Sequence, residues 1–172
     1  AGLAHRRAAQ RRAVDAVEVP VGEALAYYTG INDGLLGAIA RAPRLAERAA
    51  MANRTTAFVN LLQAKERAGL ERAVLANTFS ADAFGAGMFE RFVGLVAAQR
   101  AYLEGFHALA DARTEALFEQ ALKPAVTAPV TRLRETARTG GNDGFAVDAG
   151  AWFDAATARI EALRTVEQGM VE

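Results

Sequence analysis

Residues 57–77 read AFVNLLQAKERAGLERAVLAN, and this stretch decides the fold class. Apolar side chains recur in it every three or four residues, which is the spacing of one face of an α-helix. The stretch contains no proline, and the same pattern extends on both sides of it. We therefore expect one helix from about Arg44 to Asn77, which would be about 50 Å long at a rise of ~1.5 Å per residue.

Similar patterns predict helices elsewhere in the chain. They cover Leu3 to Val17, Val21 to Ala42, Met88 to Leu122 and a last helix that starts near the N-cap candidate Asp148. Prolines after residue 122 should divide or kink the chain before helix resumes to about residue 138, and residues 139–144 form the clearest loop. The predicted fold class is all-α, an elongated antiparallel helical bundle of the four-helix type with two long central helices.

The composition limits the classes of function. The chain has 172 residues, which suits a single domain over residues 1–172. It carries 20 Lys and Arg against 20 Asp and Glu, so there is no basic excess and we predict no nucleic-acid partner. No apolar run approaches the ~18 to 20 residues of a membrane span. We interpret the chain as a piece of a longer protein.

An enzymatic function is not expected. The chain has no Cys and two His, and it lacks a phosphate-binding loop, a nucleophile elbow and a catalytic triad. Glu104 and His107 match one element of a di-iron bundle, but such a site needs a second element and two more glutamates. We predict no catalytic residues, no metal site and no cofactor.

Charged residues fall on the apolar side of the central helix. Glu66 lies four residues after Leu62, which places it on the predicted core stripe, and Lys65 and Arg72 lie on the neighbouring stripe. Burying a charge is costly unless it is paired. These residues therefore frame either an anion or polar-ligand site around Arg72, or a structural network with partners on adjacent helices.

Three polar side chains on the other predicted helices are further candidates for ligand contact. Gln99 lies on the apolar stripe of its helix and could hydrogen-bond a ligand or the Glu66 network. Tyr28 and Asn32 are four residues apart and share a helix face that could line a polar pocket. For each of the three, ordinary packing in the core is the alternative.

The segment Lys65-Glu66-x-x-Gly69-x-Glu71-Arg72-Ala73 resembles the nitrate- and nitrite-sensing (NIT) domain family. The resemblance extends to Tyr27-Tyr28-x-x-Ile31-Asn32 and to the terminal stretch from Trp152 to Glu167, so it covers most of the chain. It implies a small anion ligand, nitrate or nitrite, held by arginines, with Arg72 matching the arginine of the motif. A Gln-x-Glu-Arg-Gly motif that is typical of the family's first helix is absent from this sequence.

The resemblance also implies a setting for the domain. It predicts the periplasmic sensor of a bacterial transmembrane receptor for chemotaxis or two-component signalling, acting as a homodimer and reaching the membrane only through flanking segments. Two alternatives follow from the residues themselves. One is a structural or protein-interaction bundle without a small ligand, and the other is a set of helices that binds a lipid surface.

Overall fold

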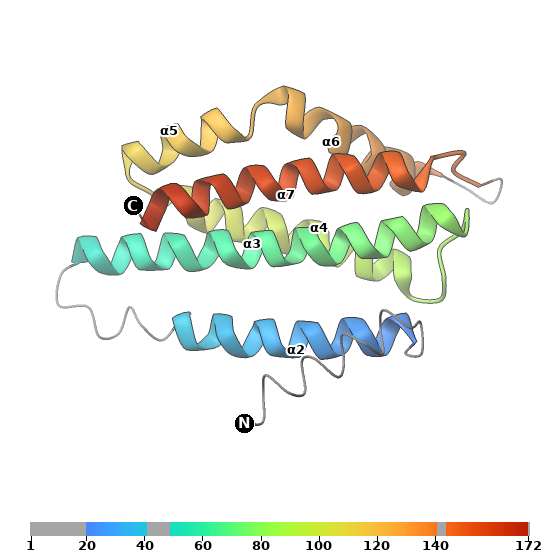
Figure 1. The fold of residues 1–172 in the computed structure, drawn as a ribbon, viewed down its shortest axis with the longest axis horizontal. Helices are drawn as coiled ribbons and strands as arrows, with labels where there is room; N and C mark the ends of the chain where they lie inside the picture. The colour runs from blue at the N-terminus through green and yellow to red at the C-terminus, as the bar shows by residue number, and fades with distance from the viewer. Residues whose placement is uncertain (1–19, 41–48, 141–143, 172) are drawn as a thin grey trace. The chain divides into compact units, whose positions relative to one another are not determined.

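The computed structural model describes residues 20–40, 49–140 and 144–171 (Figure 1). The chain forms two compact units, Ala1–Ile39 and Ala40–Glu172. The helix α2 (Val21–Ala40) lies in the first unit except for its last residue. The described residues are helical with connecting turns and contain no strand, so the all-α prediction is confirmed. The helix predicted over residues 3–17 lies outside the described residues.

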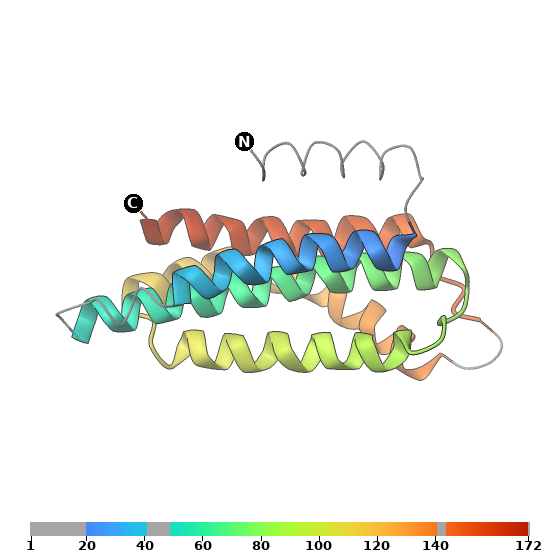
Figure 2. The same cartoon turned by 90° about the horizontal axis from the view of Figure 1, so that it is seen from below.

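The second unit is a helical bundle. Its helices are α3 (Ala49–Ser80), α4 (Met88–His107), α5 (Ala112–Ala121), α6 (Pro124–Thr139) and α7 (Ala149–Val171). α3 packs along both α4 and α7, and Figure 2 shows these two helices on opposite sides of it. α5 and α6 both pack on α7 and together occupy the fourth position, and consecutive positions run in opposite directions (Figure 1). None of the described helices has the length and apolar content that crossing a membrane requires.

The second predicted long helix is interrupted. Helix α4 ends at His107 and α5 begins at Ala112, so the prediction of one helix from Met88 to Leu122 is wrong in its continuity. Asp111 adopts an extended backbone conformation, and its side chain accepts a hydrogen bond from the backbone N–H of Thr114 at 2.8 Å. Such an N-cap satisfies a donor that a helix end leaves free, and it starts a new helix in a new direction.

Apolar side chains form two separate clusters in this bundle. The first surrounds Trp152 near the α3–α4 turn and includes Leu75, Phe79, Phe92 and Val130. The second lies toward the other end of α7 and includes Leu61, Phe106, Leu163 and Met170. Each half of the bundle therefore has its own apolar core.

Asp82 joins two turns at the end of the bundle near Trp152. Its Oδ1 accepts hydrogen bonds from the backbone N–H groups of Phe145 at 2.7 Å and Ala146 at 3.3 Å. These bonds hold the Phe145 ring edge-on against Phe79, with the ring centroids 5.5 Å apart. The Asp82 backbone has a φ of 51°, which aspartate and asparagine tolerate better than other side chains.

Replacing Asp82 with alanine is expected to lower the free energy of unfolding by about 1–3 kcal/mol, because two backbone donors lose their acceptor. Urea unfolding followed by circular dichroism measures the change. Asp82→Asn keeps an acceptor oxygen and suits the positive φ, so its loss should be clearly smaller. Equal stability of the alanine variant and the wild type would show that this junction does not hold the turns together.

Candidate functional site

Four polar side chains from four helices form a buried layer between the two apolar clusters. They are Glu71 on α3, Gln99 on α4, Arg134 on α6 and Arg159 on α7, and we call them the polar layer. The apolar clusters use residues before and after these positions on α3, α4 and α7. The polar layer thus separates the two apolar clusters of the bundle.

A bidentate ion pair forms one side of the polar layer. Arg134 donates from Nε to Oε1 of Glu71 at 2.6 Å and from Nη2 to Oε2 of Glu71 at 2.5 Å. Gln99 donates from Nε2 to Oε2 of Glu71 at 2.7 Å. Paired fork-to-carboxylate bonds of this kind are short and strong, so the Glu71 carboxylate is fully engaged.

The amide of Gln99 links this ion pair to the second arginine. Its Oε1 accepts hydrogen bonds from Nη2 of Arg134 and from Nη1 of Arg159, both at 2.8 Å. A guanidinium group carries five N–H donors. Among the described residues Gln99 is the one hydrogen-bond partner that the structure gives Arg159, and this bond uses one of the five donors.

The polar layer has a net positive charge. Two guanidinium groups face one carboxylate, and the exposed fractions are 1% for Glu71, 2% for Gln99 and 8% for Arg159. Burial, together with the positive charge of Arg134, lowers the pKa of Arg159 to about 10, although the Glu71 carboxylate opposes this shift. Arg159 therefore stays protonated at neutral pH. A buried charge without a counter-charge is costly, and an anion beside Arg159 would compensate it.

Arg72, the predicted centre of the site, lies beside the layer in sequence but makes other contacts. Its Nη1 donates to Oγ1 of Thr157 at 2.8 Å, and its guanidinium lies over the ring of Phe153 at 4.6 Å from the centroid. Its backbone carbonyl accepts a hydrogen bond from Nε1 of Trp152 at 2.9 Å. These contacts tie α3 to α7, so the role of Arg72 in ligand binding remains a prediction.

The other predicted site residues are spread over the molecule. Lys65 forms an ion pair with Glu167 on α7. Gln99 joins a charged network, but its partner on α3 is Glu71 where Glu66 was expected, and its contact with a ligand remains a prediction. Tyr28 and Asn32 lie on α2, in the first unit, and remain predictions.

The assignment of Glu66 to the core stripe is wrong. Glu66 is only partly buried, whereas Glu71 is buried, because the inward face of α3 passes through Ala64, Ala68, Glu71 and Leu75. This stripe has the 4-3-4 spacing of a helix face. The stripe that contains Glu66 lies beside this face and is not the centre of the core.

Three members of the polar layer are not among the predicted site residues, although the sequence around each of them carries a signal. Glu71 lies between the buried Ala68 and Leu75, and Arg159 lies between the buried Ala156 and Leu163 at the same spacing. Arg134 falls between Val130 and Ala137, which are also buried. The pattern that indicates the layer is a charged residue with buried residues three or four positions before and after it on the same helix.

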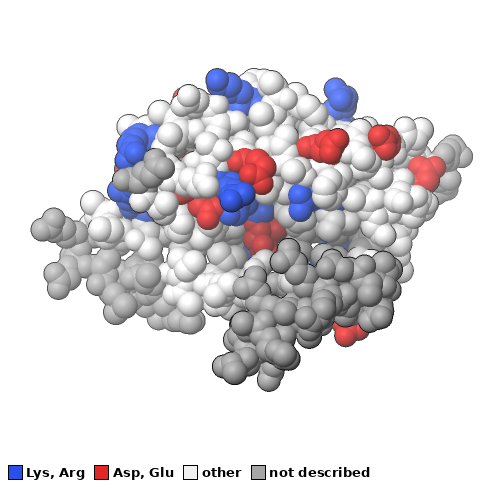
Figure 3. Space-filling view, in the orientation of Figure 1, with Lys and Arg blue, Asp and Glu red and all other residues white. Residues whose placement is uncertain are grey.

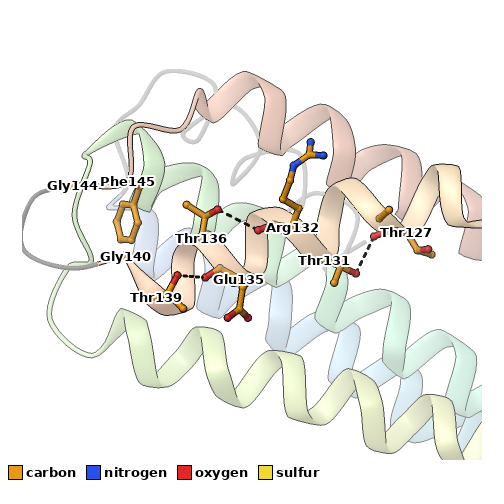
Figure 4. A pocket seen from close by; sticks show the side chains of 10 residues that line it. Thr127, Thr131, Arg132, Glu135, Thr136, Thr139, Gly140, Gly144 and Phe145 are labelled. Carbon is orange, nitrogen blue, oxygen red and sulfur yellow. Dashed lines mark hydrogen bonds between the residues drawn. The ribbon is translucent and has the colours of Figure 1, made fainter.

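A shallow groove on the outside of α6 is a weaker candidate. It has a volume of about 810 Å³ and is lined by threonines of α6 and by Phe145 (Figure 4). The hydroxyl groups of Thr131, Thr136 and Thr139 donate to carbonyl oxygens of their own helix, four residues earlier. These three hydroxyl groups are therefore already engaged within α6.

The surface charges do not indicate a site on the face that Figure 3 shows. Acidic and basic side chains are interspersed on the visible part of this face, and neither sign forms a continuous patch. The excess of positive charge that could hold an anion lies instead in the buried polar layer.

Comparison with known proteins gives two relatives. The nitrate regulatory protein of Klebsiella oxytoca is 30% identical over 165 residues, which cover 95% of this chain and 41% of that protein. The solved structure of the NasR transcription antiterminator matches with a TM-score of 0.86 at 29% identity, covering 96% of this chain and 45% of that one. The chain thus spans less than half the length of either relative.

These relatives correct three predictions. A nitrate regulatory protein and a transcription antiterminator overturn the predictions of a transmembrane receptor sensor for chemotaxis or two-component signalling, and of a periplasmic location. The prediction that excluded nucleic acid as a partner is also wrong, because an antiterminator acts in transcription.

The family resemblance itself is confirmed, since the sequence matches the family described as "Nitrate and nitrite sensing" over residues 2–172. The chain belongs to the nitrate- and nitrite-sensing (NIT) family.

Proposed function

We propose that this chain is the anion-sensing region of a regulatory protein, and that it binds nitrate or nitrite beside Arg159 in the polar layer. The observation that carries the proposal is the net positive charge of a buried cluster in which two arginines share one glutamate. The family membership and the two relatives support nitrate or nitrite as the anion.

The chemistry of the layer suits a small planar anion. A guanidinium group is planar and presents parallel N–H donors, and the oxygens of nitrate or nitrite can accept two of them at once. The partners that hold Arg159 and Arg134 come from α3 and α4, so their positions are fixed before a ligand arrives. Such preorganisation lowers the cost of ordering side chains on binding.

Binding at this place can act on the arrangement of the helices. The layer takes one side chain from each of α3, α4, α6 and α7, so a ligand there contacts or neighbours every long element of the bundle. A ligand shifts a conformational equilibrium by the difference between its affinities for the two states. We propose that this shift is the signal passed to the rest of the regulator.

Calorimetric titration of the 172-residue chain with sodium nitrate and sodium nitrite tests the proposal, with chloride and sulfate as comparison anions. We expect a saturable heat with nitrate or nitrite, and at 100 times the dissociation constant the anion should add about 2.7 kcal/mol to the free energy of unfolding. The absence of heat, together with thermal melts that no anion changes, would instead favour a structural polar layer without a ligand.

A further inference from the structure

A groove opens between α4 and α6 on one side of the bundle. It has a volume of about 430 Å³, and its lining includes Phe92, Val96 and Ala97 from α4. The backbone of α4 packs closely on α3, and that of α6 packs closely on α7, whereas the backbones of α4 and α6 lie farther apart and these two helices meet through side chains such as Gln99 and Arg134. The groove therefore lies over this wider gap between two helices of the bundle.

Arg134 belongs to both the groove and the polar layer. It lines the groove from α6, and it also holds Glu71 and Gln99 inside the bundle. Its side chain is 20% exposed, whereas the side chain of Glu71 is 2% exposed. Arg134 is thus the member of the layer that connects the buried cluster with this groove.

Arginines outnumber acidic residues among the side chains that line the groove, with Arg100, Arg134 and Arg138 against Glu135. Arg100 pairs with Glu104 at 2.8 Å and Arg138 pairs with Glu135 at 3.1 Å, so the rim carries ion pairs as well as the excess of arginines. The side chains of Arg100 and Arg138 are 82% and 63% exposed, so their charges act through water. Cationic groups around an opening raise the local concentration of anions and the rate of their association.

We propose that the α4–α6 groove is the entrance through which an inorganic anion reaches the polar layer, and that Arg134 forms its inner end. This inference rests on the proposed function, because it assigns a route to the same site. Arg100 and Arg138 act on the approach of the anion and do not hold it once it is bound. They therefore determine the association rate and contribute little to the dissociation rate.

Stopped-flow measurement of nitrate binding tests the proposal. Trp152 is the only tryptophan of the chain and is fully buried two turns before Arg159 on α7, so its fluorescence can report binding. In the double variant Arg100→Glu with Arg138→Glu, we expect the association rate to fall about three- to tenfold at low ionic strength. The dissociation rate should stay within twofold of the wild type, and the difference should shrink at high salt.

Arg164→Glu is the matched control for the charge change. Arg164 forms an i,i+3 pair with Glu161 on α7, just as Arg138 does with Glu135 on α6, and both pairs are about equally exposed. Arg164 does not line the groove. Its variant should bind nitrate at the wild-type rate.

A second variant narrows the groove without changing charge. Ala97→Phe places a ring in the groove and should slow association and dissociation together, which leaves the dissociation constant nearly unchanged. Ala125→Phe is its control, because Ala125 is exposed on α6 outside this groove. Circular dichroism melts check that each variant is folded.

The outcomes separate this inference from the proposed function. If the wild type binds nitrate and all groove variants bind at the wild-type rate, the anion enters elsewhere and only the entrance is refuted. If the wild type does not bind nitrate or nitrite, both proposals fail. Slower binding in the groove variants, with unchanged controls, supports the entrance.

Discussion

Replacing Arg159 with methionine is expected to abolish nitrate binding while leaving the unliganded protein at least as stable as the wild type. The substitution removes the guanidinium that carries the unbalanced charge of the polar layer. Oε1 of Gln99 still accepts a hydrogen bond from Arg134, so no buried acceptor loses its last partner. Removing an uncompensated buried charge should change the free energy of unfolding by between zero and about +2 kcal/mol without nitrate.

Calorimetry with nitrate and urea unfolding in its absence measure the two effects in this variant. Arg164→Met is the control, because it removes an exposed arginine from the same helix and should leave both affinity and stability unchanged within ~0.5 kcal/mol. A large loss of stability with normal nitrate affinity would mean that Arg159 supports the fold and does not bind the ligand.

The second large effect is expected at Glu71. Glu71→Gln keeps the size of the side chain but removes the only negative charge of the polar layer, which leaves the buried Arg159 and the partly buried Arg134 facing each other through Gln99. Breaking one partner of a buried ion pair typically costs about 3–5 kcal/mol. Urea unfolding should therefore show a loss of this size, and saturating nitrate should restore part of it by supplying the missing negative charge.

Glu104→Gln is the matched control for this substitution. Glu104 pairs with Arg100 on the surface of α4, where its side chain is 64% exposed, so the change should cost less than about 1 kcal/mol. Equal effects of the two substitutions would show that the Glu71 pair behaves like a surface pair. In that case the polar layer would not be the charged interior that the proposal requires.

Much of the fold could be predicted because helices follow from local apolar spacing and capping residues. The apolar spacing around residues 57–77 predicted α3, and Asp148 was correctly identified as an N-cap, since it accepts hydrogen bonds from the N–H groups of Gly150 and Ala151. The break after His107 was missed. It depends on one capping side chain, Asp111, in a stretch whose apolar pattern continues through it.

The site could be predicted only in part, because it is assembled from residues far apart in the chain. Gln99 and the region around Arg72 were identified, since each stands out on its own helix. The hydrogen bonds of the polar layer join residues that lie 28 to 63 positions apart in the sequence, and no single helix shows them. The apolar periodicity predicts which side of each helix is buried. It does not predict which residues of the four helices lie at the same level along the bundle, because that depends on how the helices pack.

The polar layer also limits how the bundle can move. A slip of α7 by one turn, about 5.4 Å, would replace Arg159 at this level by Ala156 or Leu163, neither of which can hydrogen-bond Gln99. Translation along the helix axis therefore breaks the layer, whereas small rotations and tilts keep it. The layer works as a fulcrum, so the helices can pivot about the middle of the bundle and their two ends swing in opposite directions.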